Sequence, residues 1–220
     1  MLSACALMSV GVIACDAQSI QAVGSAGGVY RPDQGCTLVE EADQCPGPGA
    51  ALPQLRFETP VNPGVATDAM RGTLSDPQVS CRHSFCGTGS LATHAELAWN
   101  DDPAFPQRAA SFKVTLPAAR DLMGRTVSFA VYVPDLTVPM HAQIGVIFDH
   151  WRYVQWAPLA QGWNRVSGVV SPANTLTKID AAVTSIPVTS LQIDVFVPVN
   201  TVAGTKGSWS GDIYLDDIAW

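Results

Sequence analysis

The sequence predicts an all-β protein, an antiparallel β-sandwich of two sheets with little helix. From about Leu52 onwards, short runs rich in Val, Ile, Phe and Trp alternate with Gly, Pro, Asn and Asp, a pattern typical of strands joined by turns. A single short helix is possible, near Thr175–Val183. Many short strands with almost no helix favour a sandwich over a mixed α/β fold.

The expected strands follow the apolar runs in order along the chain. They are predicted near Gln54–Glu58, Gln78–Cys81, Ser90–Trp99, Ala110–Leu116, Thr126–Val133, Ala142–Asp149, Tyr153–Ala157, Asn164–Val170, Ser190–Val197 and Asp212–Trp220. The sequence has no internal repeat of solenoid length.

Alternation within four strands separates a core face from a second face. Residues 127–133, 143–149, 153–157 and 191–197 each have one apolar face, which in the third strand contains Val154 and Trp156. The second faces together carry Tyr132, Gln143, Asp149, Tyr153, Gln155, Gln192, Asp194 and Phe196. Aromatic rings pack against sugar C–H faces, while amides and carboxylates bind hydroxyls, so these residues indicate a carbohydrate-binding surface. The alternative is the ordinary solvated face of an antiparallel sheet.

Composition and charge exclude one class of partner. The chain has 220 residues, enough for one sizeable core or two small ones, and 47% of them are apolar and 14% charged. Twelve basic and 19 acidic side chains give a formal net charge of −7. Nucleic-acid binding needs a basic surface, so we expect no nucleic-acid partner.

The N-terminus indicates export. Residues 4–14 are an apolar run of signal-peptide length that ends in "VIAC". This ending resembles a bacterial lipobox, which implies that residues 1–14 are removed and Cys15 is lipidated. "LSAC" at Leu2–Cys5 is a second match, no Lys or Arg precedes the run, and a buried apolar segment is the alternative. The resemblance implies a lipid-anchored protein of the bacterial cell envelope, periplasmic or on the outer surface, or a secreted one. Membrane contact is expected through the lipid only.

The four remaining cysteines predict two disulfides in an exported chain. Three pairings are possible, and the local one, Cys36–Cys45 with Cys81–Cys86, closes two short loops. A metal site is the alternative for Cys81 and Cys86, because His83 lies between them. Residues 15–51 are rich in Gly, Ala, Pro and Gln and are expected to form a flexible tether with a small disulfide loop, followed by the sandwich domain at 52–220.

Four stretches of the predicted sandwich resemble the jelly-roll carbohydrate-binding modules of the galactose-binding-like superfamily. They are "LRFET" at Leu55–Thr59, "GTGSLATH" at Gly87–His94, the middle strands "GRTVSFAVYVP" and "GWNRVSGVV", and the closing strand "GDIYLDDIAW". Together they span residues 52–220. The resemblance implies a jelly roll that binds a glycan or polysaccharide on one sheet.

The resemblance also implies a structural Ca²⁺ ion near the two ends of the domain. Its predicted ligands are Glu58, Asp216 and carbonyl groups near Gly89 and Ser90. Ca²⁺ binds six to eight oxygen atoms, and this region could supply carboxylates and carbonyls together. The alternative is that Asp216 accepts hydrogen bonds from backbone amides, with no metal.

The sequence assigns no catalytic residue. Glycosidases need two carboxylates about 5–10 Å apart, and Asp149 with Asp194 would qualify only if their strands pair. Adjacent Asp216 and Asp217 should face opposite sides of a strand, with Asp217 nearer to solvent. The apolar residues around them cannot all face inward on strict alternation, so a local kink is expected there. The serine-hydrolase and zinc-protease motifs are absent from the sequence.

The sequence thus predicts an exported, lipid-anchored, non-catalytic carbohydrate-binding domain. Trp151 is expected to be an exposed stacking residue at a hairpin tip, alongside the second-face residues above. Trp156 and Trp163 are expected in the core. The alternatives are a surface lipoprotein with a structural or adhesion role that contacts protein partners and, less favoured, a glycoside hydrolase or polysaccharide lyase.

Overall fold

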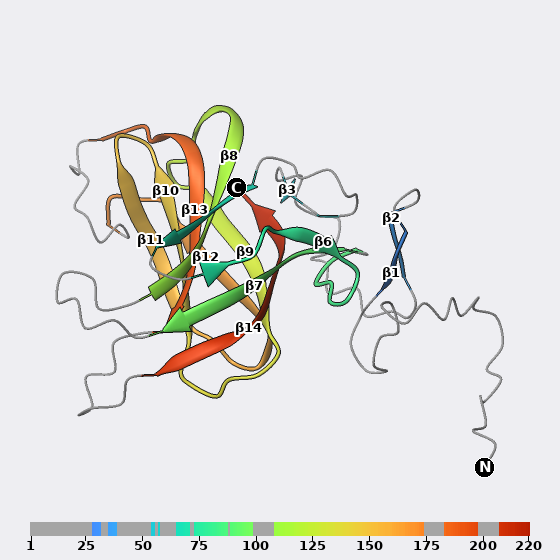
Figure 1. Cartoon of the computed structure of the whole chain (residues 1–220). Coiled ribbons are helices and arrows are strands. Elements are labelled where there is room, and N and C mark those ends of the chain that lie inside the picture. The colour runs from blue at the N-terminus through green and yellow to red at the C-terminus, as the bar shows by residue number, and fades with distance from the viewer. Residues whose placement is uncertain are drawn as a thin grey trace, which may run out of the picture.

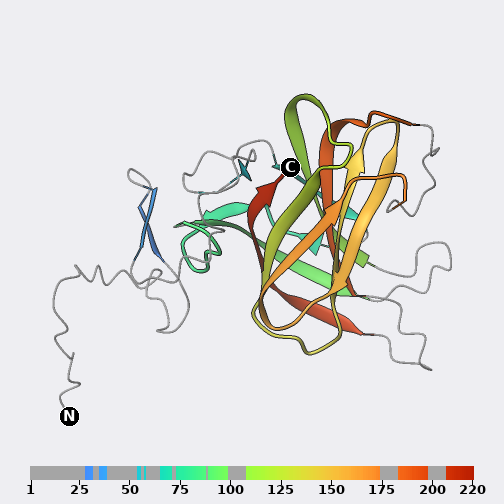
Figure 2. The same ribbon diagram turned by 180° about the vertical axis from the view of Figure 1, so that it is seen from behind.

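The structure, a computed structural model, describes most of the predicted sandwich. The described residues are 28–31, 35–38, 54–55, 57, 65–70, 73–87, 89–98, 108–173, 183–197 and 207–220. Every regular element within these ranges is a strand, and the strands of the domain form two antiparallel sheets packed face to face (Figure 1, Figure 2). The predicted all-β sandwich is confirmed. No helix among these residues is long and apolar enough to span a bilayer.

One layer is a five-stranded sheet. Its order is β11 (Trp151–Pro158), β10 (His141–Ile147), β13 (Pro187–Val197), β8 (Arg108–Asp121) and β4 (Val65–Met70). β10 and β11 form a hairpin, whereas β13 lies between β10 and β8 and so joins segments that are far apart in the sequence.

The other layer is a seven-stranded sheet. Its main order is β12 (Gly162–Val169), β9 (Thr126–Val133), β14 (Ser208–Ala219), β7 (Ser90–Ala98) and β5 (Thr73–Leu74). Two short strands complete it: β3 (Gln54–Leu55) pairs with β14, and β6 (Gln78–Ser80) pairs with β7. β14 contacts three strands of this sheet, so the C-terminal strand is central to the layer.

The core lies between the sheets and follows the predicted alternation. In β9 the residues Val127, Phe129, Val131 and Val133 are fully buried, as are Leu191, Ile193 and Val195 of β13. They meet Phe112 of β8 and Leu215 of β14 in one cluster. Burial of these side chains is the main favourable contribution to folding, because each contributes about 1.5–3 kcal/mol on leaving water.

Several elements differ from the prediction. β4 and β5 were not expected, because "VATDAM" and "TL" are short and lack a clear alternation of apolar residues. β8 extends to Asp121, beyond the expected end at Leu116. A hairpin of β1 (Gly28–Arg31) and β2 (Gly35–Leu38) occurs within the segment expected to be a tether. Residues 174–182, which carry most of the possible helix, lie outside the described residues.

The closing strand β14 contains the expected kink. Its pairing with β9 shifts register between Asp216 and Ala219, and Asp217 has a φ of 45°. This left-handed conformation is uncommon for residues other than glycine, although Asp tolerates it better than most. The bulge lets Leu215 and Ile218 both enter the core, which strict alternation would forbid. The expectation that Asp217 lies nearer to solvent was wrong, because both aspartates are fully buried.

Candidate functional site

The side of the five-stranded sheet that faces away from the core, called the outer face below, carries a row of functional side chains. Strand register places Trp156 opposite Gln143, Gln143 opposite Asp194, and Asp194 opposite Ser111. Residues directly opposite in antiparallel strands share a face and touch, so these four form one row across β11, β10, β13 and β8. We call it the polar row.

Asp194 is the centre of the polar row. Its carboxylate accepts hydrogen bonds from Ser111 Oγ at 2.5 Å and from Gln143 Nε2 at 2.7 Å. Gln192 Nε2, two residues away on the same strand, donates to both oxygens at 3.0 and 3.3 Å. Asp194 is only 3% exposed, although it lies on the side away from the core. A buried carboxylate with three side-chain donors is a preorganised network, unlike an ordinary solvated sheet face.

Trp156 provides an exposed ring at one end of the polar row. Its residue is 46% exposed, the highest value among the large apolar residues that the structure describes. The imidazole of His141 lies 4.8 Å from it, centroid to centroid, and Phe196 packs edge-on against His141 at 5.8 Å. Partial burial lowers the pKa of His141, which favours the neutral ring next to the indole.

The expected core position of Trp156 was wrong because of a β-bulge. The pairing of β10 with β11 shifts register between Ile144 and Gly145, so that Gly145 faces Tyr153 while Gln143 faces Trp156. The extra residue reverses the alternation after Val154, so Val154 stays in the core while Trp156 joins Tyr153 on the outer face. Nothing in the sequence around Trp156 indicates this change of phase.

The same bulge places Gln155 away from the polar row. Gln155 is opposite the core residue Ile144, at the edge where β11 meets β12 of the other sheet. The two strands approach closely there, since a Cβ built on Gly168 would lie 2.7 Å from Gln155 Cβ and 2.9 Å from Val154 Cγ1. Only a glycine at position 168 allows this contact.

The other predicted ligands are divided between several places. Gln143, Gln192, Asp194, Tyr153 and Phe196 share the outer face, and burial raises the pKa of Tyr153 to about 12. Two residues that the sequence did not single out, Ser111 and His141, join them. Alternation along β10 could have identified His141, which lies two residues from Gln143, whereas β8 contained no predicted face residue from which to find Ser111.

Three more predicted ligands, besides Gln155, lie apart from the polar row. Asp149 lies at the β10–β11 hairpin tip, where the guanidinium of Arg152 donates to both of its oxygens at 3.1 and 2.8 Å and holds its pKa near 2. Trp151 begins β11, but its side chain lies outside the described part. Tyr132 belongs to β9 of the seven-stranded sheet, so it cannot act together with Gln143.

The loop 81–87 covers part of the seven-stranded sheet. The ring of His83 stacks on Tyr132 at 3.9 Å and meets Tyr214 edge-on at 4.7 Å, while Phe85 packs against Trp163. The backbone N–H groups of Phe85 and Cys86 donate to Asp216 Oδ2 at 2.9 and 2.8 Å. The loop therefore occupies the surface around Tyr132, in contrast to the exposed Trp156 on the other sheet.

Cys81 and Cys86 flank this loop. Both are buried and disulfide-bonded. Their pairing with one another stays a prediction, as does that of Cys36 with Cys45, since Cys45 lies outside the described residues.

The predicted metal ligand Asp216 acts as a cap in the described part of the chain. Asp216 Oδ1 accepts the N–H of Asp217 at 2.7 Å, in addition to the two N–H groups on Oδ2. Asp217 Oδ2 accepts a hydrogen bond from Arg165 at 2.6 Å. Calcium needs oxygen ligands, so these N–H donors and this cation do not by themselves fit a calcium site. Glu58 lies outside the described residues, and calcium stays a prediction.

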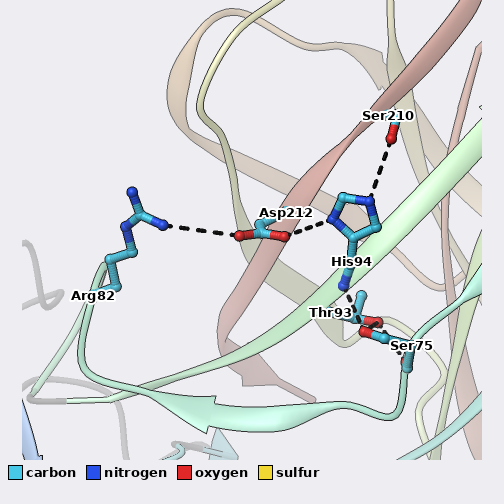
Figure 3. A network of polar contacts seen from close by, with 6 residues as sticks. All are labelled: Ser75, Arg82, Thr93, His94, Ser210 and Asp212. Atoms are coloured by element: carbon cyan, nitrogen blue, oxygen red, sulfur yellow. Dashed lines mark hydrogen bonds and ion pairs between the residues drawn. The ribbon is translucent and has the colours of Figure 1, made fainter. Parts of the chain in front are cut away.

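A second polar cluster lies on the seven-stranded sheet (Figure 3). His94 Nδ1 contacts Asp212 Oδ1 at 2.8 Å, and Ser210 Oγ lies 3.3 Å from His94 Nε2. The connectivity matches that of a Ser-His-Asp triad. However, about half of the His94 side chain is exposed, and Arg82 lies 3.9 Å from the other oxygen of Asp212. Ser210 lies within a regular strand rather than on a sharp turn, and a solvent-exposed arrangement lacks the water-excluded setting that such catalysis needs. We assign no catalytic role to it.

Comparison with known proteins gives a consistent fold. The sequence matches no protein-family model and no curated protein. A structure of carbohydrate-binding modules from the β-sandwich superfamily, described for promiscuous specificity, matches with a TM-score of 0.52 and 16% identity. That match covers 84% of this chain, which spans 65% of the length of the other. The fold is thus a β-sandwich of the kind found in that structure.

Two further structures support the same fold. The carbohydrate-binding module TmCBM27, described for specific mannan recognition, matches with a TM-score of 0.50 at 12% identity over 76% of this chain and 94% of the module. CBM28, a module specific for non-crystalline cellulose, has a TM-score of 0.50 at 13% identity, over 79% and 95% of the two chains. At such identities the likeness establishes the fold alone.

His83 predicts a pH dependence of stability. Burial, assisted by the nearby charge of Arg82, lowers the pKa of His83 from 6.5 to about 4, despite the opposing effect of Asp212. The unfolded state therefore binds more protons between these pH values, and the contribution of His83 to stability is lost as pH falls from about 6.5 to 4. We expect His83→Phe to gain stability relative to the parent over this range, measured by urea denaturation at several pH values.

The comparison has an internal control. Burial also raises the pKa of Asp216 to about 7, which gives a stability contribution that is lost as pH rises from about 4 to 7. Both proteins retain Asp216, so its contribution cancels in their difference. Tyr132→Phe keeps both the imidazole of His83 and the aromatic ring that it stacks on, so its stability should depend on pH as that of the parent does. A stability difference between His83→Phe and the parent that does not change with pH would contradict the assignment.

Proposed function

We propose that the protein is a non-catalytic carbohydrate-binding domain whose site is the outer face of the five-stranded sheet. The observation that carries the proposal is the exposed ring of Trp156 next to the buried hydrogen-bonded network of Asp194. The fold shared with carbohydrate-binding modules supports it. We assign no catalysis to this site.

The residues of the outer face supply two complementary kinds of contact. The indole of Trp156 can pack against the C–H face of a sugar ring, as aromatic side chains do in interfaces that are both apolar and wet. Gln143 and Gln192, which are partly exposed, offer amide groups to the sugar hydroxyls. Because Asp194 already holds these two side chains in place, a ligand loses little binding energy to ordering them.

Mannan and non-crystalline cellulose are suitable first probes, since two proteins of the same fold are described as binding them. We expect Trp156→Ala to weaken binding to soluble mannan or hydroxyethylcellulose by at least about tenfold, which corresponds to about 1.4 kcal/mol of lost stacking. Affinity electrophoresis in native gels measures this as lost retardation.

Val169→Ala is the matched control. Val169 is also an exposed apolar residue, at 39%, but it lies on β12 of the other sheet, so its removal should leave retardation unchanged. If the folded parent protein is not retarded by any glycan of a broad panel, the proposal is wrong and the adhesion role becomes the better explanation.

A structural calcium ion is proposed from the family resemblance, with Glu58 as the ligand that would join Asp216. An ion bound only to the native state must raise stability. We expect the melting temperature, measured by calorimetry, to fall by several degrees when EDTA replaces Ca²⁺. Glu58→Gln should abolish the difference. Equal melting temperatures of the parent under both conditions would leave Asp216 as a cap for the loop amides alone.

Export and lipidation at Cys15 are proposed from the lipobox-like "VIAC". A lipidated chain expressed in a bacterial host should incorporate labelled palmitate and fractionate with membranes. Cys15→Ser should remove the label, whereas Cys5→Ser should not. Label retained in Cys15→Ser but lost in Cys5→Ser would move the modified residue to the earlier match.

A further inference from the structure

The network around Asp194 fixes the orientation of two amide side chains. A glutamine amide can usually be turned by 180°, which exchanges its N–H donors and its carbonyl acceptor. Here the amide nitrogens of Gln143 and Gln192 both lie within 2.7–3.3 Å of the carboxylate oxygens of Asp194. A carboxylate only accepts hydrogen bonds, so both NH₂ groups must face it.

This orientation decides what the polar row offers to a ligand. With each NH₂ group directed at Asp194, the Oε1 atoms of Gln143 and Gln192 lie on the far ends of their amides. Ser111 also donates its single proton to Asp194, which leaves its oxygen with acceptor capacity only. The glutamines therefore present their two carbonyl oxygens as acceptors, beside the second N–H of Gln143, and the group that organises them is itself an anion.

We infer that Asp194 is a positioning residue that makes the site selective for neutral glycans. Hydroxyl groups of a neutral sugar can donate to the carbonyl oxygens of the two partly exposed glutamines. A carboxylated or sulfated sugar would instead bring acceptors and negative charge to oxygens already grouped around a buried carboxylate. This inference rests on the proposed carbohydrate-binding function.

The other charged groups of the outer face do not reverse this preference. Lys113 of β8 lies opposite Gln192, one row away from Asp194, and is exposed, so solvent and salt screen its charge. The pKa of His141, in the adjacent row, is lowered by burial, which favours its neutral form. Among the four residues of the polar row, Asp194 is the charged one.

Paired glycans that differ only in charge test the selectivity. Soluble mannan is compared with the same mannan oxidised at part of its primary hydroxyls to carboxylates, and hydroxyethylcellulose is compared with carboxymethylcellulose. We expect the parent protein to bind the neutral member at least about tenfold more tightly, at low and at moderate salt. Asp194→Asn, whose amide both donates and accepts, should allow one glutamine to turn and reduce the ratio to below about threefold.

Variants at the edge of the network guard against a folding defect in Asp194→Asn. Gln143→Ala and Gln192→Ala each remove one oriented carbonyl and keep Asp194, and both side chains are partly exposed. Each should weaken binding of the neutral glycan by about threefold or more. Unchanged binding by both variants would overturn the inference, whatever Asp194→Asn does.

A measurement without ligand tests the amide orientation separately. In ¹H–¹⁵N spectra of the free protein, the NH₂ protons of Gln143 and Gln192 should exchange with water at least about tenfold more slowly than those of the exposed Gln78. Asp194→Asn should remove the protection from at least one of the two amides. A substitution that only lowered the melting temperature would leave both amides protected. Fast exchange of both amides in the parent would overturn the inference.

The outcomes separate this inference from the proposed function. If the parent binds neutral and carboxylated glycans equally and Trp156→Ala binds neither, the selectivity is overturned and the proposed carbohydrate binding stands. No binding of any glycan by the folded parent overturns the proposed function and the selectivity together. Slow amide exchange with a large neutral preference supports both.

Discussion

The arrangement of the molecule depends on the carboxylate of Asp216. It lies fully buried on the central strand β14 and accepts three backbone N–H groups, two of them from the loop 81–87. An unpaired buried carboxylate would be costly, and unpaired buried amides would be costly as well, so each satisfies the other. This contact fixes the loop over the seven-stranded sheet and leaves the five-stranded sheet as the layer that presents an exposed aromatic ring.

Asp216 and Asp194 show how one residue type serves two purposes in the same fold. Asp216 is held by backbone groups, so its partners are set by the path of the chain. Asp194 is held by the side chains of Ser111, Gln143 and Gln192, and the two glutamines remain partly exposed. The first interaction determines where a loop lies, and the second determines how a surface is presented. Loss of the Asp216 carboxylate would therefore affect the position of the loop 81–87, whereas loss of the Asp194 carboxylate would affect the orientation of the outer-face side chains.

The sequence predicted the fold well where alternation is regular. The boundaries of β9 agree with the expected Thr126–Val133, and the apolar faces of β9 and β13 are the core faces. Prediction failed at bulges, because one extra residue exchanges the two faces of a strand. At Ile144/Gly145 this reversed the assignment of Trp156, the residue on which the proposed site most depends. The kink at Asp216 and Asp217 could be foreseen, because four apolar residues around it needed to face the same way.

Pairing between strands was the other missing information. Gln143, Gln192 and Asp194 could be selected as second-face residues, but their neighbours depend on contacts between segments about 50 residues apart. Tyr132 has the same local pattern and lies in the other sheet, since nothing local specifies the sheet to which a strand belongs. Ser111 entered the network through β8, whose alternation gave no sign of a polar partner across the sheet.

The close contact at Gly168 has an effect on how the surface can change over evolutionary time. Gly168 belongs to β12 and touches Val154 and Gln155 of β11, the strand that carries Trp156. The exposed ring can vary with little disturbance to the core, whereas a Cβ at position 168 would lie 2.7 Å from Gln155 Cβ and would require β11 or β12 to shift. Position 156 can therefore change the exposed surface, whereas position 168 controls the contact that closes the sandwich, so substitutions at the first need not disturb the second.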